Sequence, residues 1–184
     1  MAGLMRIGRP GAAAGPSFAT PLAMLLECHR RIEAQCDTLA RLVPHVGALG
    51  SDAAAAEAAQ AVIRYFELAA PNHHADEELD LFPALLEAMA GSDAVCLREM
   101  TATLAAEHQE LERRWAGLHA TLERIARGQA AVLSGAEVDG FASLYRSHIA
   151  REEAELLPMA ERLIDAATLE RIGAAMRRRR GASD

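Results

Sequence analysis

Aromatic residues and strand-forming patterns are scarce in this chain. Phe, Trp and Tyr together make up only 4% of the 184 residues, and the hairpin signal Asn-Gly does not occur. No segment alternates apolar and polar residues over the length of a strand. Ala and Leu dominate instead, and these residues lose the least free energy on entering a helix. The composition therefore favours an all-α protein over one built on a sheet.

Long apolar runs and patterned cysteines are also missing. No stretch approaches the roughly 18 consecutive apolar residues that a membrane-spanning helix requires. The N-terminal stretch has Arg6 and Arg9 but no apolar core of a signal peptide. Cysteine occurs only at Cys28, Cys36 and Cys96, an odd number that argues against a disulfide framework. We therefore expect a cytoplasmic protein in a reducing compartment.

Basic residues are fewer than acidic ones, 19 against 26. The formal net charge is −7 at pH 7, which makes the chain a poor candidate for binding nucleic acid or anionic lipid. The one basic run, Arg177 to Arg180, ends the last predicted helix, where cations suit the helix dipole. We interpret this run as a solvated helix end, and a contact for a protein partner is the alternative.

Turn residues and helix caps divide the chain into helical segments. Residues 1–19 are rich in Gly, Ala and Pro and are predicted to form a disordered tail. Helices are then predicted from Thr20-Pro21 to between Pro44 and Gly50, from Ser51-Asp52 to about residue 89, from 91–93 to Gly128, and from 133–140 to about Ile164. The predicted fold is an up-down-up-down four-helix bundle over residues 20–164, with a short C-terminal helix and basic tail over 165–184, capped by Asp165.

The segment PNHHADEELDLFP, residues 71–83, contains two overlapping His-x-x-x-Glu pairs. They are His73 with Glu77 and His74 with Glu78. The first pair shares a helix face with apolar residues, whereas the second is turned about 100° away. We therefore predict that His73 and Glu77 point into the bundle.

A second copy of this segment supports the same register. YFELAAPNHHADEELDLFP (65–83) aligns without a gap with GFASLYRSHIAREEAELLP (140–158). The second copy offers a single His-x-x-x-Glu pair, His148 with Glu152, and it falls on His73 and Glu77. The repeat therefore predicts two equivalent inward-facing pairs.

Two further histidines, His29 and His108, lie midway along the first and third predicted helices, on apolar stripes. The histidines at 29, 73, 108 and 148 are spaced by 44, 35 and 40 residues, about one helix and turn each. In an antiparallel bundle this spacing returns every helix to the same level. Six side chains are therefore predicted to converge on one interior point: His29, His73, Glu77, His108, His148 and Glu152.

Ionisable side chains that face a core are costly unless a cation compensates them. This set has too many ligands for a tetrahedral zinc site but enough for two metal ions, and mixed imidazole and carboxylate ligation suits iron or manganese. Because each Glu lies one turn beyond its His, it can bridge two metals while its His binds one. A ferritin-like site needs Glu-x-x-His pairs, which these segments lack.

The chain resembles the hemerythrin-like, or HHE cation-binding, family, and in particular its bacterial members. The likeness lies in ECHRRIE around His29, HHADEELDLFP, AEHQEL around His108, and HIAREEAELLP, over about residues 20–164. The resemblance implies a four-helix bundle with a non-heme centre of two iron ions, joined by an oxo or hydroxo bridge, with manganese left open. It also implies that the four histidines are terminal ligands and that Glu77 and Glu152 bridge.

One position departs from the oxygen-carrying hemerythrins, which have a fifth histidine one turn after that of the third helix. In this chain the position is occupied by Glu112. Either Glu112 is a conditional ligand, or one metal ion has an additional open coordination position. This favours reaction with O2, peroxide or NO over reversible oxygen carriage. His74 and Glu78 are further candidate ligands, and Tyr145 either hydrogen-bonds a metal-bound ligand or packs in the core.

The sequence therefore predicts a non-heme di-iron protein that binds or reacts with O2, NO or peroxide, as a sensor, scavenger or store. An enzyme that turns over peroxide or NO, and a metal-free helical interaction protein, are the alternatives. The expected partner is a small diatomic ligand or peroxide, without nucleic acid or membrane. The pattern leaves the physiological ligand and the oligomeric state open.

Overall fold

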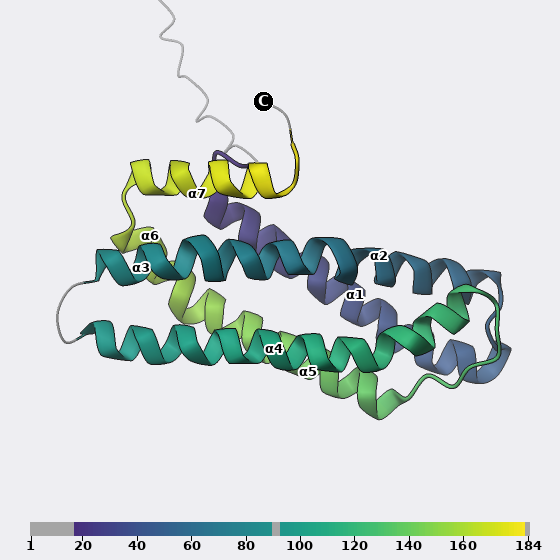
Figure 1. The fold of residues 1–184 in the computed structure, drawn as a ribbon. Helices are drawn as coiled ribbons and strands as arrows, with labels where there is room; N and C mark the ends of the chain where they lie inside the picture. Colours follow the sequence, from purple (N-terminus) through teal and green to yellow (C-terminus); the bar gives the residue numbers. More distant parts are fainter. Residues whose placement is uncertain (1–16, 90–92, 183–184) are drawn as a thin grey trace, which may run out of the picture.

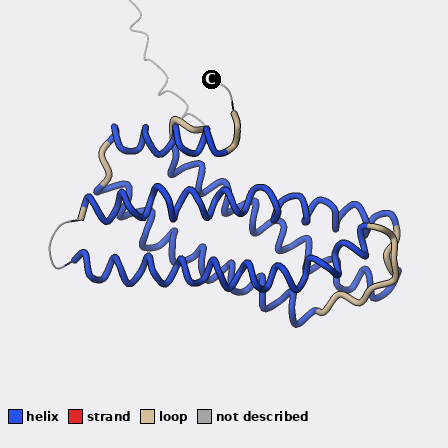
Figure 2. The backbone as a smooth tube through the Cα atoms, viewed as in Figure 1, coloured by secondary structure: helices blue, strands red, loops and turns tan. Residues whose placement is uncertain are grey.

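Residues 17–89 and 93–182 are described by the computed structural model, and within them the chain forms only helices, loops and turns (Figure 2). Four helical rods run alongside one another to make a bundle (Figure 1). The first is α1 (Pro21–Leu49) and the third is α4 (Asp93–Ala126). This arrangement confirms the predicted all-α bundle. No helix among the described residues is both long and apolar enough to cross a membrane.

The second and fourth rods are each interrupted by a π-helical turn. The second consists of α2 (Ala53–Asp76), the turn η1 (Glu77–Leu81) and α3 (Phe82–Ala88). The fourth consists of α5 (Gly135–Arg151), the turn η2 (Glu152–Leu156) and α6 (Leu157–Leu163). The sequence predicted one helix for each of these rods, with a kink at Pro71 in the second. In the structure Pro71 lies inside α2, and the two π turns are an addition to the prediction.

Most predicted helix ends are capped as expected. The side chains of Asp52, Ser134 and Asp165 each accept a hydrogen bond from a backbone N–H in the first turn that follows. Gly128 follows α4 with a φ of 67°, as expected of the residue after a helix. Thr20 precedes α1 but does not cap it, because its hydroxyl donates to the carbonyl of Ser17 instead. Of the tail predicted to be disordered, residues 1–19, positions 1–16 lie outside the described residues, whereas 17–19 form a turn in which the N–H of Thr20 donates to the carbonyl of Ser17 at 2.9 Å. Positions 91 and 92 of the cap predicted at 91–93 also lie outside the described residues.

The apolar core consists of two clusters. One lies toward the end of the bundle where α1 meets α2, and includes Leu39, Phe66 and Phe141. The other includes Leu85, Leu104 and Leu156. Cys36 belongs to the first cluster, which agrees with its interpretation as a small core residue. Between the two clusters lie the buried histidines and glutamates, so the bundle contains a polar layer with an apolar cluster on either side.

The last helix, α7 (Ala166–Arg179), lies outside the four rods and packs against α1, α2 and η1 (Figure 1). Its apolar residues Ile172 and Met176 join the second core cluster. A Cβ atom at Gly173 would lie 1.9 Å from the backbone oxygen of Phe18, so only glycine allows the N-terminal segment to cross α7 this closely. Both ends of the described chain therefore meet on α7.

The interpretation of the arginine run as a solvated helix end was wrong for Arg179 and Arg180. Both side chains are only 18% exposed, and their guanidinium groups bind the carboxylate of Asp76, which is fully buried. Arg180 Nη2 lies 2.5 Å from Asp76 Oδ2, and Arg179 Nη2 lies 2.6 Å from Asp80 Oδ2. A buried carboxylate requires such partners, and the sequence pattern alone did not reveal one for these cations.

Candidate metal centre

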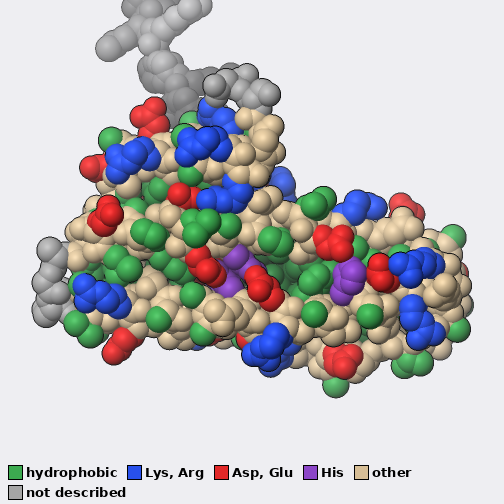
Figure 3. Space-filling model, viewed as in Figure 1, with side chains coloured by type: hydrophobic (Ala, Val, Ile, Leu, Met, Phe, Trp, Pro, Cys, Tyr) green, Lys and Arg blue, Asp and Glu red, His purple; other side chains and the backbone are tan. Residues whose placement is uncertain are grey.

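The six predicted donors do meet at one level of the bundle. The four rods supply His29, His73 with Glu77, His108, and His148 with Glu152, and each side chain is at most 1% exposed. Figure 3 shows histidine atoms between acidic side chains on the face formed by α2 and α4, although the six donors themselves are buried. The alternation of up and down rods places these residues together although they are far apart in the sequence.

The donors form two groups that share Glu77 and Glu152. His29 and His73 complete one group, and His108 and His148 complete the other; within each group the donor atoms lie within 4.8 Å of one another. Glu77 has Oε1 3.4 Å from His73 Nε2 and Oε2 3.3 Å from His108 Nε2. Each oxygen of this carboxylate therefore faces a different pair of histidines.

Glu152 repeats this arrangement from the opposite rod. Its Oε2 lies 3.1 Å from His29 Nε2, and its Oε1 lies 3.2 Å from His148 Nε2. The carboxylate oxygens of Glu77 and Glu152 have no hydrogen-bond partner among the described residues, although both are buried. Buried carboxylates are normally hydrogen-bonded or metal-bound. These orphaned oxygens, facing imidazole nitrogens, fit a site for metal cations.

Three further carboxylates contact the outer nitrogens of the candidate ligand histidines. Glu153 Oε1 lies 2.9 Å from His29 Nδ1, Glu78 Oε1 lies 2.6 Å from His108 Nδ1, and Glu107 Oε2 lies 2.9 Å from His148 Nδ1. A carboxylate at Nδ1 keeps a proton on that nitrogen, so Nε2 is the nitrogen that faces inward and that could bind a cation once its own proton is released, as in most metal-binding histidines. His73 is the exception, since its Nδ1 has no partner among the described residues.

Glu107 and Glu153 were missed by the sequence analysis. The signal for Glu153 was present in the repeat, because it aligns with Glu78 and each is the second residue of a Glu-Glu pair. No comparable signal marked Glu107, which contacts a histidine 41 positions further along the chain.

Each π turn begins at a shared carboxylate. The N–H of Phe82 donates to the carbonyl of Glu77, and the N–H of Leu157 donates to that of Glu152, so both bonds span five residues. π turns are uncommon and occur often at functional sites, where they widen a helix by one residue. The two consecutive glutamates contact different parts of the site. Glu77 faces the interior donors, and Glu78 contacts the outer nitrogen of His108.

The three further candidate ligands lie outside the two donor groups. Glu112 is exposed on α4, and Glu78 supports His108. His74 is buried, 6% exposed, and its ring stacks on that of His108 at a centroid distance of 3.9 Å. Tyr145 is buried too, and its hydroxyl lies 3.4 Å from His74 Nε2. His74 lies on a different helix face from His73, but its side chain is buried all the same.

The charges of the site are strongly coupled. Burial lowers the pKa of His29, but the carboxylates of Glu152 and Glu77 outweigh it and raise that pKa to about 10. His108 behaves in the same way beside Glu77, with a pKa of about 8. Burial holds the pKa of His73 well below its usual value, with the neighbouring His29 adding to the effect. Burial opposes ionisation of Glu152, yet His148 and His29 together lower its pKa.

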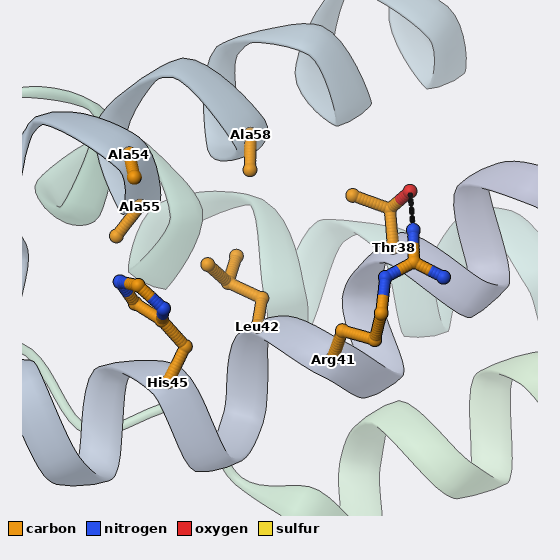
Figure 4. Close-up of a pocket in the computed structure, with 7 residues that line it drawn as sticks. All are labelled: Thr38, Arg41, Leu42, His45, Ala54, Ala55 and Ala58. Carbon is orange, nitrogen blue, oxygen red and sulfur yellow. Dashed lines mark hydrogen bonds between the residues drawn. The ribbon is translucent and has the colours of Figure 1, made fainter.

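Other surface groups are already paired and lie apart from this layer. Figure 4 shows a pocket of about 200 Å³ between α1 and α2, in which Arg41 donates to Thr38 Oγ1 at 3.1 Å. His45, on the same pocket, binds Asp52 at 2.9 Å. His119 binds Glu67 on the surface at 2.8 Å. None of these residues belongs to a donor group among the described residues.

Comparison with known proteins gives two matches. The family model described as Hemerythrin HHE cation binding domain matches residues 20–160. A protein of Haemophilus influenzae, described as uncharacterized, is 32% identical over 166 residues, which are 89% of this chain and 93% of that protein. The family match spans all six donors and ends before α7.

Proposed function

Because the chain belongs to the hemerythrin HHE cation-binding domain family, we propose that its buried donors hold two iron ions and that it binds or reacts with O2, NO or peroxide. The observation that carries this proposal is the sharing of Glu77 and Glu152 by two donor groups. Mixed nitrogen and oxygen donors suit iron, with manganese as the alternative. When bound, an iron pair supplies redox-active, Lewis-acidic positions for a small molecule.

The residues of the chain have distinct tasks in this proposal. His29 and His73 would hold one ion and His108 and His148 the other, and each shared carboxylate would offer one oxygen to either side. Glu153, Glu78 and Glu107 keep three of the imidazoles in the required tautomer and orientation. Two imidazoles and two carboxylate oxygens for each ion leave room for a small external ligand. Burial of all six donor side chains limits the access of bulk water to the layer.

Anaerobic titration of the metal-free protein with Fe²⁺ tests this proposal. We expect saturation near two ions per chain, followed in air by an optical spectrum that changes when azide is added. Saturation near one ion would contradict a dinuclear site. A protein that takes up no metal after iron supplementation would instead support the metal-free interaction protein. Manganese competition in the same titration decides between the two metals.

Replacing His73 and His74 separately tests the register. His73→Ala removes one of only two imidazoles in its donor group, so we expect at least one of the two ions to be lost. His74→Ala leaves both donor groups intact and should keep nearly the full metal content. Metal analysis of the two purified variants measures this difference. The reverse outcome would mean that His74, and not His73, is the ligand.

Metal affinity should rise with pH through the neutral range. In the metal-free protein the pKa values of His29 and His108 are about 10 and about 8, so at neutral pH both imidazoles carry a proton that a cation must displace. Each displaced proton makes the apparent affinity rise about tenfold per pH unit, as long as the pH is below the pKa of that histidine. Titration calorimetry in buffers of different ionisation enthalpy counts the protons released. A pH-independent affinity without proton release would contradict this expectation.

A further inference from the structure

A small pocket lies beside the metal layer, between α2, α4 and α5. Its volume is about 30 Å³. One water needs about 10–15 Å³ on this scale, so the pocket fits a molecule of about two non-hydrogen atoms. Apolar side chains form part of its wall, among them Phe66, Leu111 and Trp115. Its polar lining residues are His74, Glu112 and Tyr145.

The two buried polar groups of this pocket are poorly satisfied by the protein. His74 Nδ1 has no hydrogen-bond partner among the described residues. His74 Nε2 and the Tyr145 hydroxyl are 3.4 Å apart, beyond the usual hydrogen-bond range of 2.7–3.2 Å. Buried imidazole and phenol groups normally have closer partners. Their position on a pocket points to a ligand that can donate and accept hydrogen bonds.

The pocket adjoins one half of the metal layer. His74 forms part of its wall, and the His74 ring stacks on His108, a donor of the group that also contains His148. Glu112, which is exposed and one turn after His108, stands on the outer side of the pocket. A molecule in the pocket is therefore separated from the His108 half by a single imidazole ring.

We infer that this pocket is a binding site for hydrogen peroxide, held between His74 and Tyr145 beside the His108–His148 half of the centre. The inference rests on the proposed function for the metal and adds the ligand and its place. O2 and NO match the pocket in size but cannot act as hydrogen-bond donors to unpaired groups. Alkyl hydroperoxides match the polar groups but exceed the volume. Water and hydrogen peroxide both satisfy these two requirements, and of the two only hydrogen peroxide is a ligand in the proposed function.

The first test needs no metal. Trp115 is the only tryptophan of the chain and lines the pocket, so its fluorescence reports on molecules that enter. In the metal-free protein we expect hydrogen peroxide to quench Trp115, and Glu112→Phe, which covers the outer side, to reduce this quenching. Gln109→Phe adds the same ring at an exposed position of α4 outside the pocket and should leave quenching unchanged. Equal quenching in all three proteins would overturn the inference.

The second test uses the iron-loaded protein. In rapid mixing with hydrogen peroxide, Glu112→Phe should slow the optical change by about tenfold or more, while iron content stays at the wild-type level. Tyr145→Phe removes one hydrogen-bonding group and should slow the reaction with peroxide but not the binding of NO. Reaction with tert-butyl hydroperoxide as fast as with hydrogen peroxide, or unchanged rates in both variants, would overturn the inference. Failure to load iron would contradict the proposed function and leave the fluorescence result to decide on the pocket.

Discussion

Glu152→Gln is expected to reduce the metal content from two ions per chain to none. Glu152 belongs to both donor groups, and its two oxygens face His29 and His148 respectively. Glutamine has nearly the same shape but no negative charge, so both groups lose one of their two carboxylates at once. The change also removes a negative charge that would balance the proposed cations in a buried layer. Metal analysis after anaerobic reconstitution measures the loss.

The neighbouring residue provides the matched control. Glu153→Gln makes the same chemical change one position later, but Glu153 only supports His29 through Nδ1. Loss of such an outer partner costs about 10–100-fold in metal affinity and leaves the ligands in place. We therefore expect Glu153→Gln to bind both ions more weakly at low metal concentration and fully at high concentration. Full metal content in Glu152→Gln would contradict the assignment of a shared carboxylate.

Replacing Arg179 and Arg180 together by alanine is expected to destabilise the protein by about 3–5 kcal/mol, because it leaves a buried charge without a partner. Asp76 is fully buried, and both guanidinium groups bind it. Asp76 directly precedes Glu77, so we also expect the metal affinity to fall. Chemical denaturation of the metal-free protein measures the free energy of unfolding.

Two further variants distinguish the loss of the ion pairs with Asp76 from a general disruption of α7. Arg178→Ala removes an exposed arginine of the same helix and should change the free energy of unfolding by less than about 0.5 kcal/mol. Adding Asp76→Asn to the double variant removes the unpaired charge and should restore part of the stability, which a double-mutant cycle quantifies. No recovery on adding Asp76→Asn would mean that the arginines stabilise α7 by packing alone.

The bundle and its six inward donors could be predicted because they depend on regular periodicity. His73 and Glu77 lie four residues apart on an apolar stripe, and the gapless repeat places His148 and Glu152 in the same register. Helical geometry then determines which face they occupy. These features are local, so the sequence alone is sufficient to predict them.

The features that were missed depend on tertiary contacts. The π turns at Glu77 and Glu152 change the register only after those residues. A proline, Pro83 or Pro158, follows each turn by two residues, but the sequence analysis did not connect these prolines with π turns. The ion pairs of Asp76 join residues about 100 positions apart, and α7 could have extended into solvent with the same sequence pattern. His74 was assigned to a different helix face, but the neighbouring rods α4 and α5 cover that face as well.

The missing partner of His73 makes the two halves of the layer unequal. Aligning ECHRRIE with AEHQELE places His29 on His108 and Cys28 on Glu107, the residue that holds His148 from outside. Glu107 supplies a carboxylate to His148, whereas the aligned residue Cys28 has only a thiol at the equivalent position. His73, the counterpart of His148, has no partner for its Nδ1 among the described residues. The internal symmetry is therefore broken at one residue, and the half with His108 and His148 should bind metal first.

Iron uptake is expected in two distinguishable steps, at His108 and His148 before His29 and His73. A titration curve of equal, independent sites would contradict this order.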